Sequence, residues 1–242
     1  MEPKVLVASP TYEGHKYVIE EYLDRVKNLS YPYYSVLLAN NGKTKTFTRW
    51  LIKQGVKVLK TPYVDNPFER IKISRNTIIN YVLQHPDIEY VLLLDTDVIP
   101  PKNIIQKLLK HKKNLAGGLV HAGFENKVPS VLKDGYLIKN GRMGLSFYSW
   151  KEIKEMRKKR NLHKVYATSA ACLLVHRKVF ESGAKFRYTP SINVGEDVWF
   201  FSECNEKGFK FHVDVSQRIT HINKSKRRWL KSQMEKVKKN KK

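Results

Sequence analysis

Two carboxylates one residue apart follow the most apolar run in the sequence. Asp95 and Asp97 flank Thr96 directly after residues 90–94, which read Tyr-Val-Leu-Leu-Leu. In an open parallel sheet, ligands bind outside the carboxyl ends of the strands. Paired carboxylates there can share a hard divalent cation such as Mg²⁺ or Mn²⁺ with a diphosphate, and the cation neutralises a leaving pyrophosphate group. The pair therefore predicts a metal-assisted phosphate site, whereas an isolated Asp-x-Asp can also be a solvated turn.

A second acidic pair, Glu196 and Asp197, stands roughly 100 residues later, before the apolar run at 198–201. Such a pair can supply a general base and a clamp for an acceptor. The alternative is simple stabilisation of a helix start, where acidic residues are favoured. Further on, His221 closes a strand-like segment and could complete the coordination of a metal held by Asp97; a lone histidine is otherwise a surface or core residue.

These residues must be positioned by alternating strands and helices. Buried-strand patterns are expected at 5–11, 34–39, 57–59 and 90–94, and helical spacing of apolar residues at 17–28, 46–54 and 74–83. The second half is less regular, with strands expected at 115–120, 170–176 and 210–215 and helical segments at 151–160 and 202–207. The alternation predicts an α/β fold with a mostly parallel central sheet and helices on both faces.

Composition limits the class of protein. The chain has 242 residues, a hydrophobic fraction of 41% and two cysteines, so we expect a globular domain without a disulfide framework or a structural zinc. No run is long enough to cross a bilayer and no signal peptide is evident, which predicts a cytoplasmic protein. The net charge of +24 attracts polyanions, or accompanies a thermophilic or AT-rich source.

One domain is the simplest organisation. We expect it to span residues 1–222, with halves at 1–114 and 115–222, followed by a basic tail at 223–242. Lys and Arg are dense from 224 onward, with Trp229 and Leu230 on a sparse apolar stripe. A basic amphipathic helix of this kind suits an anionic membrane surface, and would make the protein peripheral at the cytoplasmic face. The alternative is a solvated tail.

The ordered set of motifs resembles the GT-A glycosyltransferases, in particular glycosyltransferase family 2. The resemblance runs from about Val5 to His221, and its specificity lies in the order of the segments. In the first half, the matching segments are the opening strand and Pro-Thr-Tyr turn at 5–12, Asn-Asn-Gly at 40–42, Ser-Arg-Asn at 74–76, and the strand with its Asp-x-Asp and proline at 90–101. In the second half, they are the small-residue strand at 169–175, the segment 177–180 that follows it, the Glu-Asp pair at 196–197 and His221. It implies a Rossmann-like GT-A fold and a hexosyltransferase-type enzyme that uses Mn²⁺ or Mg²⁺.

The resemblance also implies roles on the donor side, for a nucleotide-diphosphate sugar linked to UDP or GDP. Arg75 would reach the phosphates or the sugar, where a cation also helps the leaving group. Asp95 would contact the ribose or sugar, and the metal would lie among Asp95, Asp97 and His221. The base pocket would be lined by Pro10, Thr11, Tyr12 and Asn41.

On the acceptor side, the resemblance implies that Asp197 deprotonates an acceptor hydroxyl for direct displacement with inversion. Glu196 would orient acceptor or sugar hydroxyls. The acceptor itself stays open, since a glycan, a lipid-linked phosphate or a protein would each fit.

The sequence departs from the family where an acidic residue is expected after the second strand. Asn40 and Asn41 stand there, and an amide can still read a base edge because it both donates and accepts. Asp65, after the third strand, is the candidate to act instead.

Two other classes of protein fit the sequence less well. A sugar-phosphate nucleotidyltransferase would need a Gly-rich, Arg-containing loop after the first strand, but residues 9–15 contain one glycine. A nucleic-acid-binding protein is suggested by charge alone, yet Lys and Arg are spread widely and no binding module is evident, so no nucleic acid is expected. A degenerate, non-catalytic relative is disfavoured by the presence of Asp95, Asp97 and Asp197.

Overall fold

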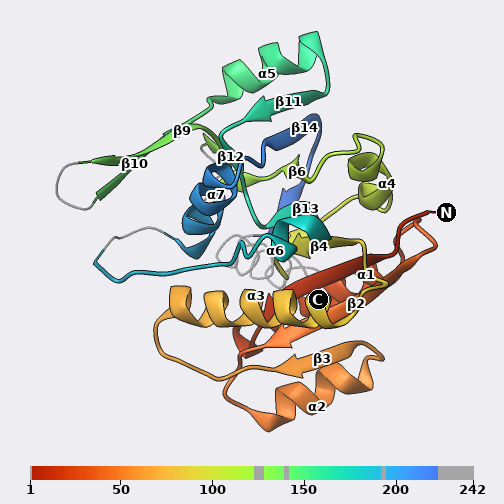
Figure 1. Ribbon diagram of the computed structural model, residues 1–242. Helices are drawn as coiled ribbons and strands as arrows, with labels where there is room; N and C mark the ends of the chain where they lie inside the picture. The colour runs from red at the N-terminus through yellow and green to blue at the C-terminus, as the bar shows by residue number, and fades with distance from the viewer. Residues whose placement is uncertain (1, 123–127, 139–141, 192–194, 223–242) are drawn as a thin grey trace, which may run out of the picture.

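A mixed sheet forms the centre of the molecule (Figure 1). The computed structural model describes residues 2–122, 128–138, 142–191 and 195–222. Within these ranges the central sheet has eight strands in the order β11-β14-β6-β13-β4-β1-β2-β3. β1, β2, β3 and β4 are mutually parallel, β6 and β14 are parallel to each other, and β13 is antiparallel to β4 and β6. The expected α/β fold with a mostly parallel sheet is confirmed.

All strands of the central sheet except β11 lie close to the expected segments; β11 lies in a stretch where no strand was expected. They are β1 (Val5–Thr11), β2 (Tyr34–Asn40), β3 (Lys57–Lys60), β4 (Tyr90–Leu94), β6 (Leu115–Leu119), β11 (Leu162–Val165), β13 (Cys172–His176) and β14 (Phe211–Arg218). Side chains alternate between the two faces of each strand. In β4, for example, Val91 and Leu93 enter one hydrophobic core while Leu92 and Leu94 enter the other.

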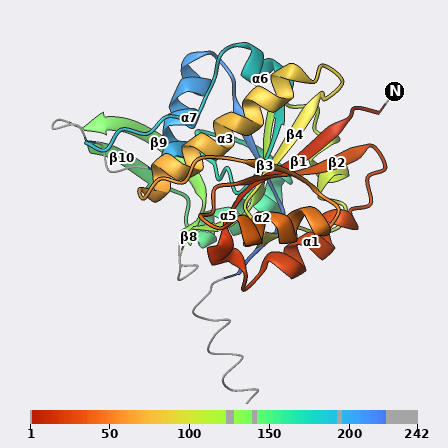
Figure 2. The ribbon, with the colours of Figure 1, turned by 90° about the horizontal axis from the view of Figure 1, so that it is seen from below.

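Helices cover both faces of the sheet. One core is closed by α1 (Ile19–Lys27), α2 (Lys45–Lys53) and α4 (Ile104–Leu109), and the other by α3 (Pro67–Gln84), α5 (Trp150–Lys159), α6 (Arg177–Glu181) and α7 (Glu196–Glu206). Figure 2 shows α3 and α6 on the side of the sheet opposite α1 and α2. Because both faces are covered, a ligand can reach these strands only at their ends.

Two helices begin earlier than the sequence predicts. α3 begins at Pro67 rather than at residue 74, because the side chain of Asn66 accepts a hydrogen bond from the Glu69 amide and Pro67 occupies the first turn. α7 begins at Glu196 rather than at residue 202, with Gly195 before it. Arg75 therefore lies in the middle of α3, and both members of the Glu-Asp pair lie in the first turn of α7.

A smaller sheet extends beyond the central one. It pairs β9 (Val131–Ile138) with β10 (Arg142–Phe147) and with β12 (Ala167–Thr168). The β9–β10 hairpin projects on the side toward which β1 runs (Figures 1 and 2). The remaining short elements are the 3₁₀ turn η1 (Glu13–His15), β5 (Val98–Ile99) paired with β15 (Thr220–His221), and β7 (His121–Ala122) paired with β8 (Val128–Pro129).

The predicted basic tail at 224–242 lies outside the described residues. Among the residues that are described, we find no helix with the length and apolar character needed to cross a membrane.

Candidate active site

The carboxyl ends of β1, β2 and β4 meet the N-terminal half of α3 around one cavity. Its volume is about 190 Å³. It is lined by Pro10, Thr11, Tyr12, His15, Asn41, Pro67, Arg70, Ile71, Asp95 and Asp97. Six of these were predicted from the sequence as donor or metal residues, and the parallel strands bring them together as an open α/β sheet should.

Two buried polar atoms at the end of this cavity have no protein partner. The Thr11 hydroxyl and Asn41 Oδ1 are both buried without a hydrogen bond. Asn41 Nδ2 donates to Ser74 Oγ at 2.9 Å, and Ser74 Oγ lies 3.1 Å from the Thr61 hydroxyl, so the amide is held in place. Unsatisfied buried groups cost free energy. The cavity is therefore prepared for a ligand with its own donors and acceptors.

The two asparagines after β2 have different tasks. Asn40 Oδ1 accepts from the Gly42 amide at 2.9 Å, and Asn40 Nδ2 donates to the Thr48 hydroxyl at 2.8 Å. Asn40 thus closes the turn and ties it to α2, while Asn41 faces the cavity. The Glu13 carboxylate approaches the same turn so closely that a Cβ on Gly42 would overlap it. A larger residue at position 42 would have to displace the Glu13 carboxylate from this turn.

Arg70 is a cavity residue that the sequence reasoning missed. Its guanidinium lies between two aromatic rings, 5.1 Å from the centroid of Tyr12 and 4.9 Å from that of Tyr63. Arg70 Nη1 also donates to the Val64 carbonyl at 3.2 Å. A cation held over ring faces is fixed in direction. Arg70 is therefore a positioned cation at the mouth of the cavity.

The missed cavity residues Pro67, Arg70 and Ile71 share one helix face with Arg75, which was predicted. Pro67, Arg70, Ile71, Ser74 and Arg75 are spaced as i, i+3, i+4, i+7 and i+8, which places them on one face of a helix that starts at Pro67. The Asn-Pro pair at 66–67 is a typical helix start. With that start assigned, the whole face follows.

Arg75 connects the donor side to the Glu-Asp pair. Its Nη2 donates to Asp95 Oδ1 at 2.9 Å and its Nη1 donates to Glu196 Oε1 at 2.7 Å. The Arg75 side chain is 4% exposed, and its Nε is buried without a partner. The three predicted residues, separated by up to 121 positions in sequence, therefore form one buried network.

Three carboxylates share this single guanidinium, because Asp197 also acts on Arg75 electrostatically. Burial raises the pKa of Glu196 to about 7, against the attraction of Arg75 and with repulsion from Asp197. Burial also raises the pKa of Asp197, again opposed by Arg75 and reinforced by Asp95. The cluster has more negative than positive charge, and proton uptake relieves the excess.

Asp97 and His221 form a separate pair beside the cavity. His221 Nε2 lies 3.3 Å from Asp97 Oδ2, and the pairing of β15 with β5 sets His221 opposite Val98. Burial alone would raise the pKa of Asp97, but the bond from His221 and the charges of His221 and His15 hold that pKa below its usual value. An ionised carboxylate beside an imidazole is a donor set that a divalent cation accepts.

The fit to a cation is partial. The separation of 3.3 Å is close to the roughly 3 Å expected between neighbouring ligands of a six-coordinate cation. Within the described residues, no group of three or more His, Cys, Asp or Glu side chains is arranged to hold a metal ion. Asp95, the third predicted ligand, is bonded to Arg75. The chain offers a pair of ligands, and a bound ion needs further oxygen atoms from elsewhere.

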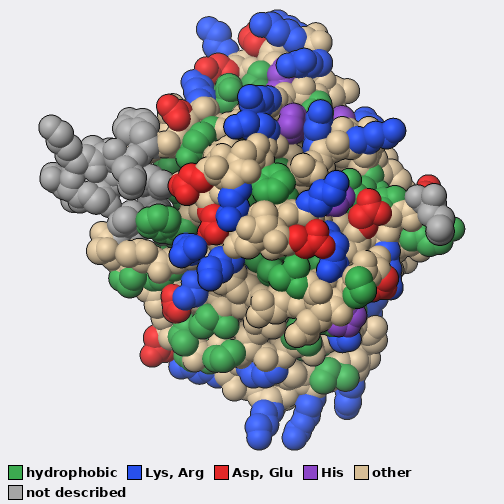
Figure 3. Space-filling view, in the orientation of Figure 1, with side chains coloured by type: hydrophobic (Ala, Val, Ile, Leu, Met, Phe, Trp, Pro, Cys, Tyr) green, Lys and Arg blue, Asp and Glu red, His purple; other side chains and the backbone are tan. Residues whose placement is uncertain are grey.

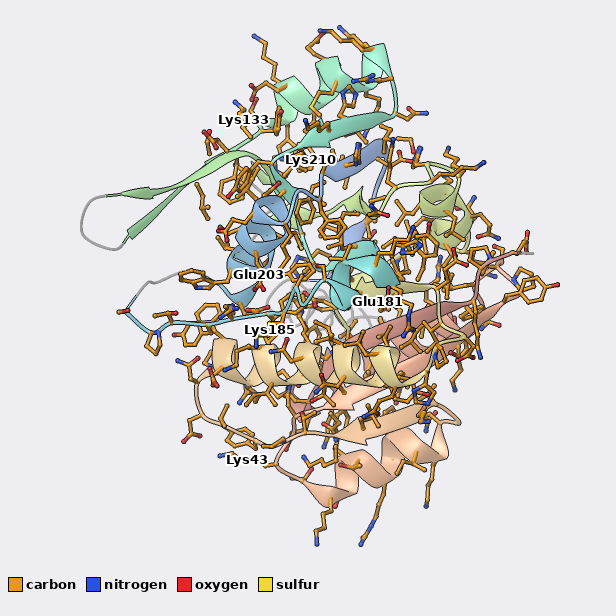
Figure 4. The ribbon with its side chains drawn as sticks, viewed as in Figure 1. Lys43, Lys133, Glu181, Lys185, Glu203 and Lys210 are labelled. Atoms are coloured by element: carbon orange, nitrogen blue, oxygen red, sulfur yellow. The ribbon has the colours of Figure 1, made fainter. Side chains whose placement is uncertain are left out.

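Asp65 lies apart from the other predicted residues. Its side chain is 95% exposed, and its nearest cation is Lys43, with Nζ 3.9 Å from Asp65 Oδ1. Lys43 lies on the loop between β2 and α2 and covers the Tyr63 ring (Figure 4). Asp65 is not among the residues that line the cavity.

Gly195 leaves room for the Asp197 carboxylate. A Cβ on Gly195 would lie 2.9 Å from Asp197 Oδ1, which is closer than carbon and oxygen normally approach. The backbone at Gly195 (φ −65°, ψ 159°) is one that alanine adopts without strain. An added methyl group would therefore act on the carboxylate rather than on the backbone.

We expect Gly195→Ala to displace the Asp197 carboxylate, so that turnover in a reaction that uses this carboxylate falls by about 10-fold or more, because a small displacement of a reacting group is costly. The free energy of unfolding should fall by only about 1 kcal/mol, since alanine is a poorer N-cap than glycine. Steady-state kinetics and urea denaturation measure the two effects. In an Asp197→Asn background the same substitution should add no further loss of turnover; an additive loss would show that it acts elsewhere.

Comparison with protein families gives one match. The model for glycosyl transferase family 2 matches residues 7–183, which is more than half of the chain. No curated protein sequence matches.

Solved structures share the fold at low identity. GalNAc-T7 with UDP, GalNAc and Mn²⁺ is similar with a TM-score of 0.64 and 13% identity, over 91% of this chain and 44% of that one. The mannosyltransferase PcManGT from Pyrobaculum calidifontis with GDP-Man and Mn²⁺ gives a TM-score of 0.57 and 14% identity, over 93% of this chain and 58% of that one. S. aureus TarS 1–349 gives a TM-score of 0.55 and 17% identity, over 89% of this chain and 59% of that one. The chain thus spans about half the length of these structures. At such identities the likeness establishes the fold.

Proposed function

Because the chain belongs to glycosyl transferase family 2, we propose that it transfers a sugar from a nucleoside-diphosphate sugar to an acceptor, with inversion at the anomeric carbon. The observation that carries the proposal is the position of Arg75. It links Asp95, which lines the cavity, to Glu196, which stands beside Asp197 on α7. The two halves of a transfer site thus lie on either side of one buried cation.

The cavity is the donor site in this proposal. The nucleoside would lie against Thr11, Tyr12 and Asn41, where two buried polar atoms need partners. Arg70 and Arg75 would approach the diphosphate and the sugar, as cations favour the negative charge there. The similar structures that contain UDP or GDP-Man support a donor of this class.

Asp97 and His221 would hold a divalent cation together with diphosphate oxygens. A bound Mn²⁺ or Mg²⁺ would neutralise the charge that develops on the departing diphosphate. Two of the similar structures contain Mn²⁺, which supports this assignment.

Asp197 is the proposed general base. An acceptor hydroxyl would give its proton to the Asp197 carboxylate as its oxygen attacks the anomeric carbon. The bond between that carbon and the diphosphate oxygen breaks at the same time, and the nucleoside diphosphate leaves on the opposite face. Glu196, bonded to Arg75, would orient hydroxyl groups beside it.

The charge pattern of the face in Figure 3 supports a small-molecule donor over nucleic acid. On this face, Lys and Arg are scattered and Asp and Glu lie among them. A nucleic-acid surface gathers its cations into a patch or stripe.

Binding of the metal should depend on the nucleotide. Because the proposed site has two protein ligands among the described residues, Asp97 and His221, we expect Mn²⁺ alone to leave the melting temperature nearly unchanged, and one nucleoside diphosphate with Mn²⁺ to raise it by several degrees. A thermal-shift screen of UDP, GDP, ADP and CDP with and without Mn²⁺ measures this and identifies the donor base.

The matched variants are Asp97→Asn, which should lose the metal-dependent part of the shift, and Asp24→Asn on the exposed face of α1, which should keep it. The proposed function fails if no nucleoside diphosphate stabilises the wild-type protein under any of these conditions.

A further inference from the structure

An exposed aromatic pair borders the Glu-Asp pair. Phe68 and Tyr188 stack with ring centroids 5.5 Å apart and an angle of 29° between the rings. Phe68 is 37% exposed, one of the few large apolar side chains on the described surface. Stacked rings at the surface leave apolar area in water, which marks a binding surface.

The pair is held firmly by the start of α3. Asn66 Nδ2 donates to the Tyr188 hydroxyl at 3.1 Å, while Asn66 Oδ1 caps the helix by accepting from the Glu69 amide at 3.0 Å. One asparagine thus fixes both the helix that carries Phe68 and the ring that stacks on it. The geometry is that of a prepared platform.

The platform adjoins Asp197. A Cβ placed on Gly195 would lie 3.8 Å from Phe68 Cε1 and 2.9 Å from Asp197 Oδ1. The Phe68 ring and the carboxylate are therefore neighbours across the same glycine. Phe68 does not line the donor cavity, whereas Pro67, Arg70 and Ile71 do. The first turns of α3 separate a donor face from an aromatic face.

The surroundings of the platform suit a neutral ligand. Arg187, next to Tyr188, is paired with Glu203 on α7 at 3.0 Å, and Lys207 donates to the Ser182 carbonyl at 2.9 Å. Figure 4 shows Glu203 on α7 above the segment that carries Lys185. These cations and acids line a hollow of about 460 Å³ along α7, together with Trp199, whose indole nitrogen is buried without a partner. Both cations of this hollow are already engaged.

We propose that the Phe68–Tyr188 stack is the acceptor subsite and that it takes the ring of a sugar, so that the acceptor is a glycan hydroxyl. The proposal rests on the function proposed above. The C–H groups on one face of a pyranose carry partial positive charge, which complements the negative face of an aromatic ring. A pyranose on this platform presents its hydroxyls at its rim, beside Asp197. A lipid phosphate would instead need a free cation there.

The test uses the full chain with Mg²⁺ and the nucleoside diphosphate that the thermal screen selects. Methyl pyranosides of glucose, galactose, mannose and N-acetylglucosamine are probed by saturation-transfer NMR, alongside a short-chain polyprenyl phosphate. We expect saturation of ring protons of at least one pyranoside, and loss of that signal in Phe68→Ala. In kinetics, Phe68→Ala should raise the KM for the sugar acceptor by about 10-fold.

Three comparisons keep the result specific. Phe68→Trp should preserve acceptor binding, which separates loss of the platform from loss of folding. Tyr33→Ala, at an exposed aromatic residue before β2, should change nothing. The affinity for the nucleoside diphosphate should stay within about twofold of wild type in Phe68→Ala, because Phe68 does not line the donor cavity.

The inference is overturned if no pyranoside binds while the polyprenyl phosphate does, or if Phe68→Ala leaves the KM for the sugar acceptor unchanged. The function proposed above fails differently, since the wild-type protein would then neither bind nor hydrolyse any nucleoside-diphosphate sugar.

Discussion

Asp197→Asn should reduce turnover by at least about 100-fold while the affinity for the donor nucleotide stays within a small factor of wild type. The amide keeps the size of the side chain but cannot accept the acceptor proton, and a general base contributes on the order of 10² to 10⁴ in rate. Transfer assays with the acceptor saturating, together with calorimetric binding of the nucleoside diphosphate, separate the two quantities.

The pH profile provides the accompanying evidence. A base works only when it is ionised, so kcat/KM in the wild type should fall as the pH is lowered through the pKa of Asp197. Because burial raises that pKa, the fall should be centred at a higher pH than the usual pKa of an aspartate. That limb should vanish in Asp197→Asn. Asp87→Asn, at an exposed residue paired with Lys4, is the control and should retain both the rate and the limb. Full turnover in Asp197→Asn would remove Asp197 from the role of base.

Arg75→Leu should produce the largest loss of stability. It leaves Asp95, Glu196 and Asp197 without their shared cation, and removing one partner of a buried ion pair costs about 3–5 kcal/mol. Urea denaturation at pH 8 measures the loss, and nucleotide-sugar turnover should disappear along with the stability.

The pH dependence of that loss tests the cause. Without Arg75 the pKa values of Glu196 and Asp197 in the folded protein rise further above their unfolded values. The folded state then binds protons more tightly than the unfolded state, so stability falls as the pH rises from the unfolded pKa values toward the folded ones. The deficit of Arg75→Leu should therefore be smaller at pH 5.5 than at pH 8.

Arg177→Leu is a matched control. Arg177 Nη1 donates to the carbonyls of Val82, His85 and Ile88 at the end of α3, and the only carboxylate bonded to its guanidinium among the described residues is the half-exposed Glu181. Its loss should destabilise the protein to a similar degree at both pH values. If the two variants respond alike to pH, the carboxylate cluster is not the source of the Arg75 effect.

The sequence was most informative where periodicity is strong. The alternation of apolar strands with helices predicted the parallel half of the sheet, since β1, the second half of β2 and most of β4 are continuous buried runs, as strands covered on both faces are. The ends of those strands then predicted most of the cavity residues. Residues at helix starts were harder, because Asn66-Pro67 reads equally as a turn, and the start of α3 was assigned too late.

Contacts between distant segments could not be read from the sequence. Nothing in a single chain indicates that Arg75 bonds to Glu196 rather than to solvent, or that Asn40 is consumed by its own turn while Asn41 faces the cavity. Such choices depend on side-chain geometry after folding. Phe68 and Tyr188 stack although they are 120 residues apart in sequence, and Asn66 is hydrogen-bonded to the Tyr188 hydroxyl. No local sequence pattern predicts this contact.

The uninterrupted course of α3 has a consequence for how substrates are aligned. This one helix carries the proposed acceptor platform at Phe68, Arg70 at the proposed donor cavity, and Arg75, which is bonded to Asp95 and Glu196. The position of the acceptor relative to the donor would thus be set by the geometry of one helix, and no separate elements would have to come together each time substrates bind. Inserting one residue between Phe68 and Arg70 would rotate Phe68 by about 100° around the helix axis relative to Arg70 and Arg75. Both binding surfaces would then keep their residues, but they would no longer face each other.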